Sequence, residues 1–94
     1  MAGYVPQRIV LFGSYARGEA RPPDSDLDLL VVKPGAASNR RESAKIRRCL
    51  RPWIGRHAFT ILPMSPERLQ ERLARGESFL QTILREGVEL YAAN

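Results

Sequence analysis

The chain has 94 residues, of which 44% are hydrophobic and 27% are charged, a composition that is typical of one small soluble domain. It excludes a disordered chain, and no apolar run is long enough to span a bilayer. A single cysteine excludes an internal disulfide, and the opening residues lack the features of a signal peptide. We therefore expect a single domain over residues 1–94 that works in the cytoplasm.

The net charge of +5 is concentrated in one segment. Residues 1–54 carry ten basic and five acidic side chains, whereas residues 55–94 carry five of each. Between Arg40 and Arg51, six basic residues are accompanied only by the acidic Glu42. This segment is either the solvated face of a helix or an electrostatic contact for an acidic partner protein or RNA. The absence of interleaved aromatic residues weakens the RNA interpretation.

In chain order, the first elements are a strand, a short helix and a second strand. Residues 8–12 are short, β-rich and followed by glycine, which favours a buried strand. Residues 14–18 are expected to form a short helix that begins at a Gly-Ser turn. Residues 19–25 contain two prolines and predict a loop. Residues 26–32, alternating at first and then wholly apolar, predict the second strand.

The next segment predicts an amphipathic helix. Asn39 can cap it, Glu42 stands where a side chain can reach back to the cap, and Pro52 suggests its end. Its apolar residues recur at spacings of three and four, so we expect them to form the buried face: Ile46, Cys49, Leu50 and Trp53.

The remaining residues predict one more strand, two helices and a short final strand. Residues 57–62 favour the strand, and Ser65–Pro66 has the chemistry of a helix N-terminus. Gly76 interrupts the helical pattern that follows, and Gly87 ends it. Residues 88–91 predict the final strand. The alternation of strands and helices indicates an α/β sheet with helices packed against it.

Two acidic residues at the start of the second strand are candidate metal ligands. Asp26 and Asp28 are two residues apart, so a strand would direct both to one face, about 7 Å apart along the backbone. Carboxylates so placed repel each other unless solvent or a divalent cation separates their charges, and hard oxygen ligands suit Mg²⁺. The alternative is a solvent-facing strand edge that binds nothing.

A Gly-Ser pair after the first strand is a candidate phosphate site. Gly13 lets the backbone approach a ligand closely, and the N-terminus of a following helix attracts phosphate. Ser14 can cap that helix and donate its hydroxyl, while Arg17 is placed to reach a triphosphate oxygen. The alternative is an ordinary turn from a strand to a helix.

The joint pattern Gly13-Ser-x-Ala-Arg-Gly and Ser25-Asp-x-Asp-Leu resembles the signature of the DNA polymerase β-like nucleotidyltransferase superfamily. It is most similar to the stand-alone minimal nucleotidyltransferases of bacteria and archaea. The resemblance implies an α/β (α+β) fold like the polymerase β palm, with a mixed β-sheet flanked by helices. It also implies that Gly13 and Ser14 hold the triphosphate, with Asp26 and Asp28 as catalytic Mg²⁺ ligands.

The resemblance further implies a reaction and a partner. The reaction is transfer of a nucleoside monophosphate, usually AMP from ATP, to an acceptor hydroxyl with release of pyrophosphate. In this branch the domain is commonly the antitoxin of a helical HEPN ribonuclease toxin, and it can modify a tyrosine of that toxin. We therefore expect a Mg²⁺-dependent nucleotidyltransferase that acts on a HEPN-type partner protein, with no membrane partner.

One position departs from the superfamily pattern, which normally has a third carboxylate on the next core strand. Counting back from the Ser-Pro pair places that position at about Thr60, whose hydroxyl is a weak metal ligand and no base at neutral pH. Glu19 and Glu67 are other carboxylates, but no spacing favours them. The alternative function is therefore a catalytically weakened nucleotide-binding antitoxin that neutralises its partner by binding. A third is a basic RNA-contacting module.

Three single residues have alternative roles. Tyr15 either stacks on a nucleobase beside the Gly-Ser turn or packs on the protein surface. His57, the only histidine, is expected at a strand start or partly buried rather than in a catalytic role. Cys49 is expected to act as a small hydrophobic residue.

Overall fold

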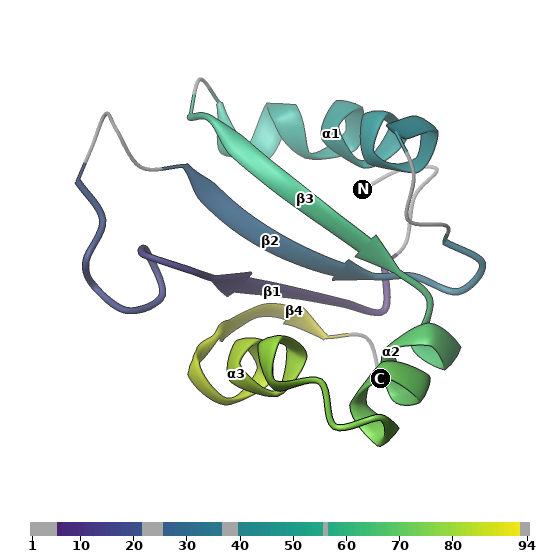
Figure 1. Ribbon diagram of the computed structural model, residues 1–94. Helices are drawn as coiled ribbons and strands as arrows, with labels where there is room; N and C mark the ends of the chain where they lie inside the picture. Colours follow the sequence, from purple (N-terminus) through teal and green to yellow (C-terminus); the bar gives the residue numbers. More distant parts are fainter. Residues whose placement is uncertain (1–5, 22–25, 37–39, 56, 93–94) are drawn as a thin grey trace.

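The computed structural model describes residues 6–21, 26–36, 40–55 and 57–92, which form a sheet of four strands with three helices (Figure 1). The strands are β1 (Arg8–Phe12), β2 (Leu27–Val32), β3 (Phe59–Met64) and β4 (Val88–Ala92), and the helices are α1 (Arg40–Ile54), α2 (Pro66–Ala74) and α3 (Ser78–Glu86). The predicted Asn39 cap, the motif residue Ser25 and most of the predicted loop at 19–25 lie outside the described residues.

The sheet is mixed and has the strand order β3-β2-β1-β4. Strands β2 and β3 run parallel, with α1 between them in the chain, and β1 is antiparallel to both β2 and β4. The predicted mixed sheet flanked by helices is therefore confirmed, and the fold is α+β.

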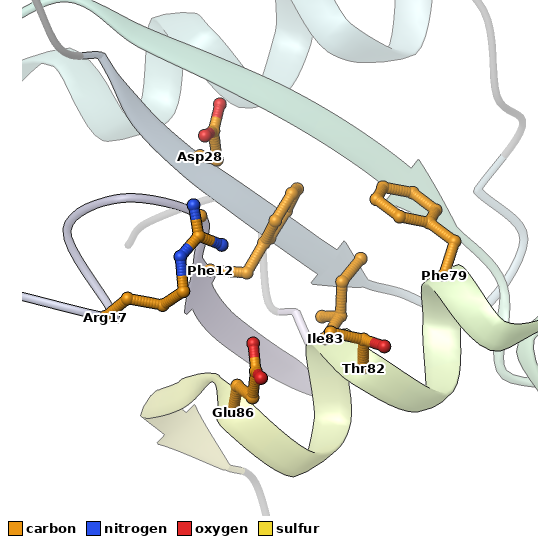
Figure 2. A pocket seen from close by; sticks show the side chains of 8 residues that line it. Phe12, Arg17, Asp28, Phe79, Thr82, Ile83 and Glu86 are labelled. Carbon is orange, nitrogen blue, oxygen red and sulfur yellow. The ribbon is translucent and has the colours of Figure 1, made fainter. Parts of the chain in front are cut away.

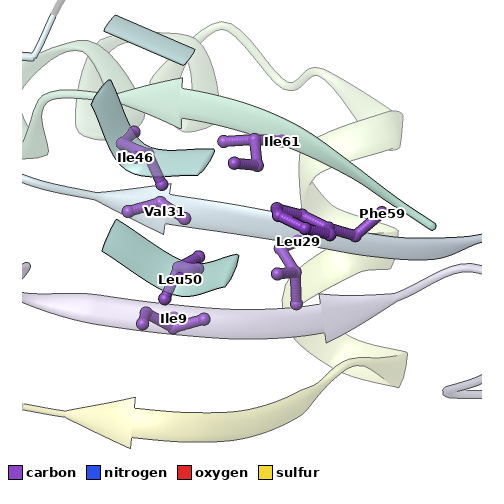
Figure 3. Close-up of a cluster of buried hydrophobic side chains, with 7 residues drawn as sticks. All are labelled: Ile9, Leu29, Val31, Ile46, Leu50, Phe59 and Ile61. Carbon is purple, nitrogen blue, oxygen red and sulfur yellow. The ribbon is translucent and has the colours of Figure 1, made fainter. Parts of the chain in front are cut away.

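Alternation along the strands builds two apolar cores, one on each face of the sheet. Helix α1 covers the first core (Figure 3), which consists of Ile9, Leu29, Val31, Ile46, Leu50, Phe59 and Ile61. Helices α2 and α3 cover the second core, which consists of Val10, Leu30, Val32, Met64, Leu69, Leu80 and Ile83. Strand β2 contributes to both cores, which explains why residues 29–32 are all apolar and all buried.

Helix α1 differs from its prediction at its C-terminal end. It continues past Pro52 to Ile54. Ile46 and Leu50 are buried as predicted, and Cys49 packs against the same core. The prediction of a buried Trp53 was wrong, because 74% of this residue is exposed. Since α1 packs most closely on β3, the helix end that carries Trp53 has no covering layer.

The helix predicted over residues 14–18 does not form. These residues make consecutive turns, in which the N–H of Arg17 bonds to the carbonyl of Gly13 (3.2 Å) and the N–H of Glu19 to that of Ser14 (2.8 Å). Gly18 has a φ of +72°, so a right-handed helix cannot continue through this residue. The four residues from Ser14 to Arg17 give too few helical bonds to offset the cost of nucleation.

The other elements lie close to their predicted positions. Strand β3 is shifted by two residues from the predicted 57–62 and passes through Pro63. A proline is tolerated there because β3 is an edge strand, where the missing N–H costs little. Helix α2 begins as predicted, with the Ser65 side chain accepting a hydrogen bond from the N–H of Arg68 (3.2 Å).

An ion pair fixes α3 relative to α2. The guanidinium of Arg72, on α2, donates to both carboxylate oxygens of Glu77, with distances from 2.7 to 3.0 Å. Glu77 immediately precedes α3, and the hydrogen bonds from Arg72 lower the pKa of its carboxyl below the ordinary value of 4.5. The pair therefore helps to set the position of α3, which forms one wall of the cavity described below.

We predict that Glu77→Gln lowers the free energy of unfolding at pH 7, and that this difference disappears in acid. A carboxyl whose pKa is lowered by folding stabilises the fold above its unfolded-state pKa and loses that effect as the pH falls through the folded-state value. Urea unfolding of both proteins between pH 7 and pH 2 measures the difference. Arg72→Gln should give the same pH dependence, and a Glu77→Gln effect that is constant with pH would contradict the assignment.

Candidate functional site

Asp28 lies where the apolar surface of the sheet ends. Its neighbours in register are Phe12 on β1 and Thr60 on β3. Farther along the same face of β2, Leu30 and Val32 are buried beneath α2 and α3. Asp28 is only partly buried, so it presents a carboxylate at the open end of this face.

A cavity of about 310 Å³ opens in front of Asp28, between the sheet and α3 (Figure 2). Its lining comes from β1, the following turn, β2 and α3, and consists of Phe12, Gly13, Arg17, Asp28, Phe79, Thr82, Ile83 and Glu86. Figure 2 shows the Arg17 guanidinium extending from the turn towards Asp28, and the Glu86 carboxylate pointing from α3 into the same space. Segments far apart in the sequence thus meet at one cavity.

The cavity has an aromatic part and a charged part. The rings of Phe12 and Phe79 meet edge to face, with centroids 6.1 Å apart and an angle of 85° between their planes. Arg17, Asp28 and Glu86 supply the charged groups. Such a combination suits a ligand that carries both a flat apolar group and a charged group.

The charges around Asp28 bear on cation binding. Partial burial raises the pKa of the Asp28 carboxyl, the negative charge of Asp26 raises it further, and the positive charge of Arg17 lowers it. Asp26, which immediately precedes β2, is exposed, so the two aspartates interact although their environments differ. A divalent cation between them would remove this repulsion, and their hard oxygen atoms suit Mg²⁺.

The acids present can supply only part of a metal's coordination shell. Across the described residues, no group of three or more histidine, cysteine or acidic side chains could hold a metal ion. Mg²⁺ commonly retains several waters and takes one or two carboxylates together with substrate phosphates. Asp26 and Asp28 therefore fit a cation that arrives with a polyphosphate, rather than one enclosed by protein.

The turn after β1 is shaped by Gly13. Its φ of +78° favours glycine, and a Cβ at this position would overlap the Oδ2 atom of Asp28 and lie 3.3 Å from its Cγ. In the part of the chain that the structure describes, the backbone N–H groups of Ser14, Tyr15 and Ala16 have no hydrogen-bond acceptor. Such groups in consecutive turns can bind an anion. The turn thus offers N–H donors next to the Asp28 carboxylate without the predicted helix.

Tyr15 and His57 fasten this turn to the rest of the fold. The Tyr15 hydroxyl and the His57 Nε2 atom are hydrogen-bonded at 2.7 Å, and their rings meet edge to face with centroids 5.2 Å apart. Arg51 donates a hydrogen bond to the carbonyl of His57 (3.0 Å). Tyr15 thus packs against His57, and His57 is partly buried as expected.

The structure brings together three of the five predicted site residues. Gly13, Arg17 and Asp28 line the cavity. Ser14 belongs to the same turn and Asp26 acts on Asp28 through its charge, but neither is among the cavity-lining residues that the structure describes.

Thr60, the position predicted for a third acid, lies beside Asp28 in the sheet. Thr60 pairs in parallel register with Asp28 and is exposed. Glu19 forms an ion pair with Arg17 (Nε to Oε2, 3.4 Å), and Glu67 lies in the first turn of α2. Neither of these two glutamates lines the described cavity, whereas Glu86 does.

Sequence reasoning missed the α3 side of the cavity. Phe79, Thr82, Ile83 and Glu86 follow the helical spacing of three and four residues, so their common face is visible in the sequence. What the sequence does not show is that this face meets Asp28. Phe12 was also missed, although its place at the end of β1 would have revealed it once the register with β2 was known.

Comparison with known proteins agrees with this geometry. The model of the nucleotidyltransferase domain family matches residues 3–90, and the chain belongs to this family. Its general activity is nucleotidyl transfer, with a nucleotide as substrate. Neither a curated protein nor a solved structure matches the chain. No helix among the described residues has the length and apolar character needed to cross a membrane.

We predict that Gly13→Ala destabilises the fold more than Gly35→Ala. Both glycines have φ near +78°, so both substitutions carry the left-handed penalty of about 1–2 kcal/mol. A Cβ at Gly35 meets nothing within 4 Å, whereas one at Gly13 overlaps Asp28, which should add about 1–3 kcal/mol. Urea unfolding followed by circular dichroism measures both free energies.

The double variant Gly13→Ala with Asp28→Ala is the control for this prediction. Because it removes the carboxylate that the new Cβ would meet, the additional cost of Gly13→Ala in the Asp28→Ala background should fall to that of Gly35→Ala. An additional cost that persists without the carboxylate would place its origin elsewhere in the turn.

Proposed function

We propose that this domain is a Mg²⁺-dependent nucleotidyltransferase that transfers AMP from ATP to a hydroxyl group of a partner protein. The observation that carries the proposal is the meeting of Gly13, Arg17 and Asp28 at one cavity. The proposed partner is a helical HEPN-type toxin, for which the domain acts as antitoxin. This part follows from the resemblance of residues 13–29 to the minimal nucleotidyltransferases.

In this proposal the turn after β1 binds the triphosphate. The N–H groups of Ser14, Tyr15 and Ala16 and the guanidinium of Arg17 contact its oxygens. Arg17 also favours the ionised form of Asp28. Asp26 and Asp28 would hold Mg²⁺, which neutralises phosphate charge and polarises the bond that breaks. The turn and the strand thereby hold the triphosphate from two sides.

The aromatic part of the cavity is the proposed place for the nucleobase. Phe12 and Phe79 present apolar surface on which a purine ring can lie. Thr82 and the Glu86 carboxylate lie nearby and can hydrogen-bond the edge of the base. The exocyclic amino groups of adenine, guanine and cytosine are all donors that suit a carboxylate, so the choice of ATP follows from the resemblance alone.

The transfer step forms one bond and breaks another. The acceptor hydroxyl oxygen forms a bond to the α-phosphorus while the bond from that phosphorus to the bridging oxygen of pyrophosphate breaks. The hydroxyl proton must leave to a base. Thr60, next to Asp28 in the sheet, cannot accept it at neutral pH.

That observation favours a second candidate function. A domain with Thr60 in this position and no group of three metal-binding side chains among its described residues can bind a nucleotide yet transfer it slowly. Such a domain would neutralise its partner by binding, with the nucleotide as a structural ligand. The two candidates share the site and differ in the chemical step.

We predict that Asp28→Asn weakens Mg²⁺-dependent ATP binding at least about tenfold, a change of about 1.4 kcal/mol. The substitution removes the charge that attracts the cation while preserving the shape of the side chain. Isothermal titration with ATP, with and without Mg²⁺, measures the effect. The matched control is Glu67→Gln, an exposed carboxylate on α2 outside the cavity. Unchanged affinity in Asp28→Asn would remove the metal assignment.

We predict that the protein transfers label from ATP, labelled at the α-phosphate, to a HEPN-type protein encoded beside it. The label should disappear in Asp26→Asn and in Asp28→Asn and remain in Glu67→Gln. Gel autoradiography detects transfer, and a ribonuclease assay of the partner detects neutralisation. Neutralisation without label would select the second candidate function. If neither label transfer nor neutralisation is detected, both candidate functions are excluded.

A further inference from the structure

The sheet face beneath α1 is only partly covered. Four strands spaced by about 4.8 Å make a face about 15 Å wide, whereas packed helices are about 8–10 Å apart. Two helices cover the other face, but α1 alone packs on this one, and it lies closest to β3. At the opposite edge, every residue of β4 is exposed. Within the described residues, a strip about one helix wide is therefore left uncovered beside α1.

Large apolar side chains gather at this strip. Among the described residues five such side chains are exposed, and four of them come from the end of α1 or from β4: Trp53 (74%), Leu90 (56%), Val88 (46%) and Tyr91 (38%). Val88 and Tyr91 face this side because they pair with Leu11, which packs against the first core, and with Ile9, which belongs to it. The register shift in this pairing leaves Leu90 unpaired beside Tyr91.

Trp53, Leu90 and Tyr91 border a groove of about 260 Å³, which we call the α1–β4 groove. Ile9 and Leu11 form part of its floor, Leu50 and Trp53 form its wall on α1, and Leu90 and Tyr91 form its wall on β4. All six side chains are apolar except for the Tyr91 hydroxyl. A groove of this kind, bounded on one side by a helix, suits the apolar face of a second helix.

The basic side chains on α1 indicate which charges a helix bound in the groove would carry. Arg47 and Arg51 are engaged elsewhere, because they donate to the carbonyls of Phe59 (2.8 Å) and His57 (3.0 Å). Both guanidiniums also lie over the Phe59 ring, 4.6 Å from its centroid. These two arginines therefore point away from the groove, and their contacts stabilise the fold.

Arg41 and Lys45 occupy the other side of the helix. They lie on one helical row with Trp53, at spacings of four and eight residues. Both are exposed, and no ion pair of either is found among the described residues. A helix lying in the groove would pass beside these two cations.

We propose that the α1–β4 groove binds an amphipathic helix of a partner protein, with an apolar face and carboxylates along one flank. Its apolar face covers Trp53, Leu90 and Tyr91, and its carboxylates lie beside Arg41 and Lys45. A second copy of this chain fits less well, because each copy carries a net charge of +5 and a basic α1. The inference is independent of the proposed transfer, since the groove and Asp28 lie on opposite faces of the sheet.

Trp53 reports directly on this groove, because it is the only tryptophan in the chain. The probe is a synthetic helical peptide of leucine and glutamate with one apolar stripe, and the matched control peptide has lysine in place of glutamate. We expect the acidic peptide to cause a saturable blue shift of the Trp53 emission, with affinity at least about tenfold higher than that of the basic peptide. Added salt should reduce this preference.

Two variants locate the binding. Leu90→Ser should abolish the shift, whereas Phe79→Ser removes an equally exposed apolar side chain from the other face (55% against 56%) and should preserve it. The double variant Arg41→Glu with Lys45→Glu, which changes only exposed positions, should reverse the preference between the two peptides. Circular dichroism confirms that each variant is folded.

Three results would overturn the inference: no saturable shift at peptide concentrations up to about 1 mM, equal affinity for both peptides, or loss of binding in Phe79→Ser but not in Leu90→Ser. A shift without peptide that grows with protein concentration, together with a doubled mass in sedimentation, would identify a second copy as the occupant instead. ATP binding by Leu90→Ser should be unchanged, so failure here leaves the proposed transfer standing.

Discussion

The antiparallel pairing of β1 with β2 is the constraint on which the candidate site depends. The pairing sets Phe12 opposite Asp28 and so brings the turn that follows Phe12 against the Asp28 carboxylate. Only a residue without a side chain fits between the two, which explains Gly13. The strand register thus places the turn beside the carboxylate, and the bond from Tyr15 to His57 helps to hold it there. Arg17, which can contact an anion, and Asp28, which can bind a cation, line one cavity next to this turn, which is an arrangement that suits a complex of metal and polyphosphate.

The sequence predicted those parts of the fold that local patterns determine. Apolar runs identified β1 and β2, and the Ser65–Pro66 pair identified the start of α2, because each signal lies within a few adjacent residues. The errors arose where the outcome depends on distant neighbours. The burial of Trp53 depends on which strands α1 covers, and periodicity within the helix carries no information about that. The five residues after Gly13 have a helical pattern, but their conformation is set by Gly18 and by the bond from Tyr15 to His57.

The candidate site was likewise predicted where its residues are close in the sequence, and missed where they are distant. Gly13, Arg17 and Asp28, which line the cavity, were predicted together because they belong to one short motif. The α3 wall was not found, because the meeting of Glu86 with Asp28 depends on how α3 packs against the sheet, which the Arg72–Glu77 ion pair and the second core help to fix. The two faces of the sheet also separate two surfaces of different character. One holds a cavity lined partly by charges and the other an apolar groove, with the buried residues of β2 between them.

The exposure of Thr60 has a consequence for whether a carboxylate can be placed beside Asp28 without loss of the fold. Thr60 stands beside Asp28 on an edge strand and takes no part in either core. Replacing its hydroxyl by a carboxylate would therefore disturb no packing and would place a further negative charge on the neighbouring strand, about 4.8 Å away along the sheet. A carboxylate at this position would thus change the charge beside Asp28 with little effect on fold stability. In the proposed function, a lineage could therefore gain or lose the third acid through changes in a single codon while the fold is kept.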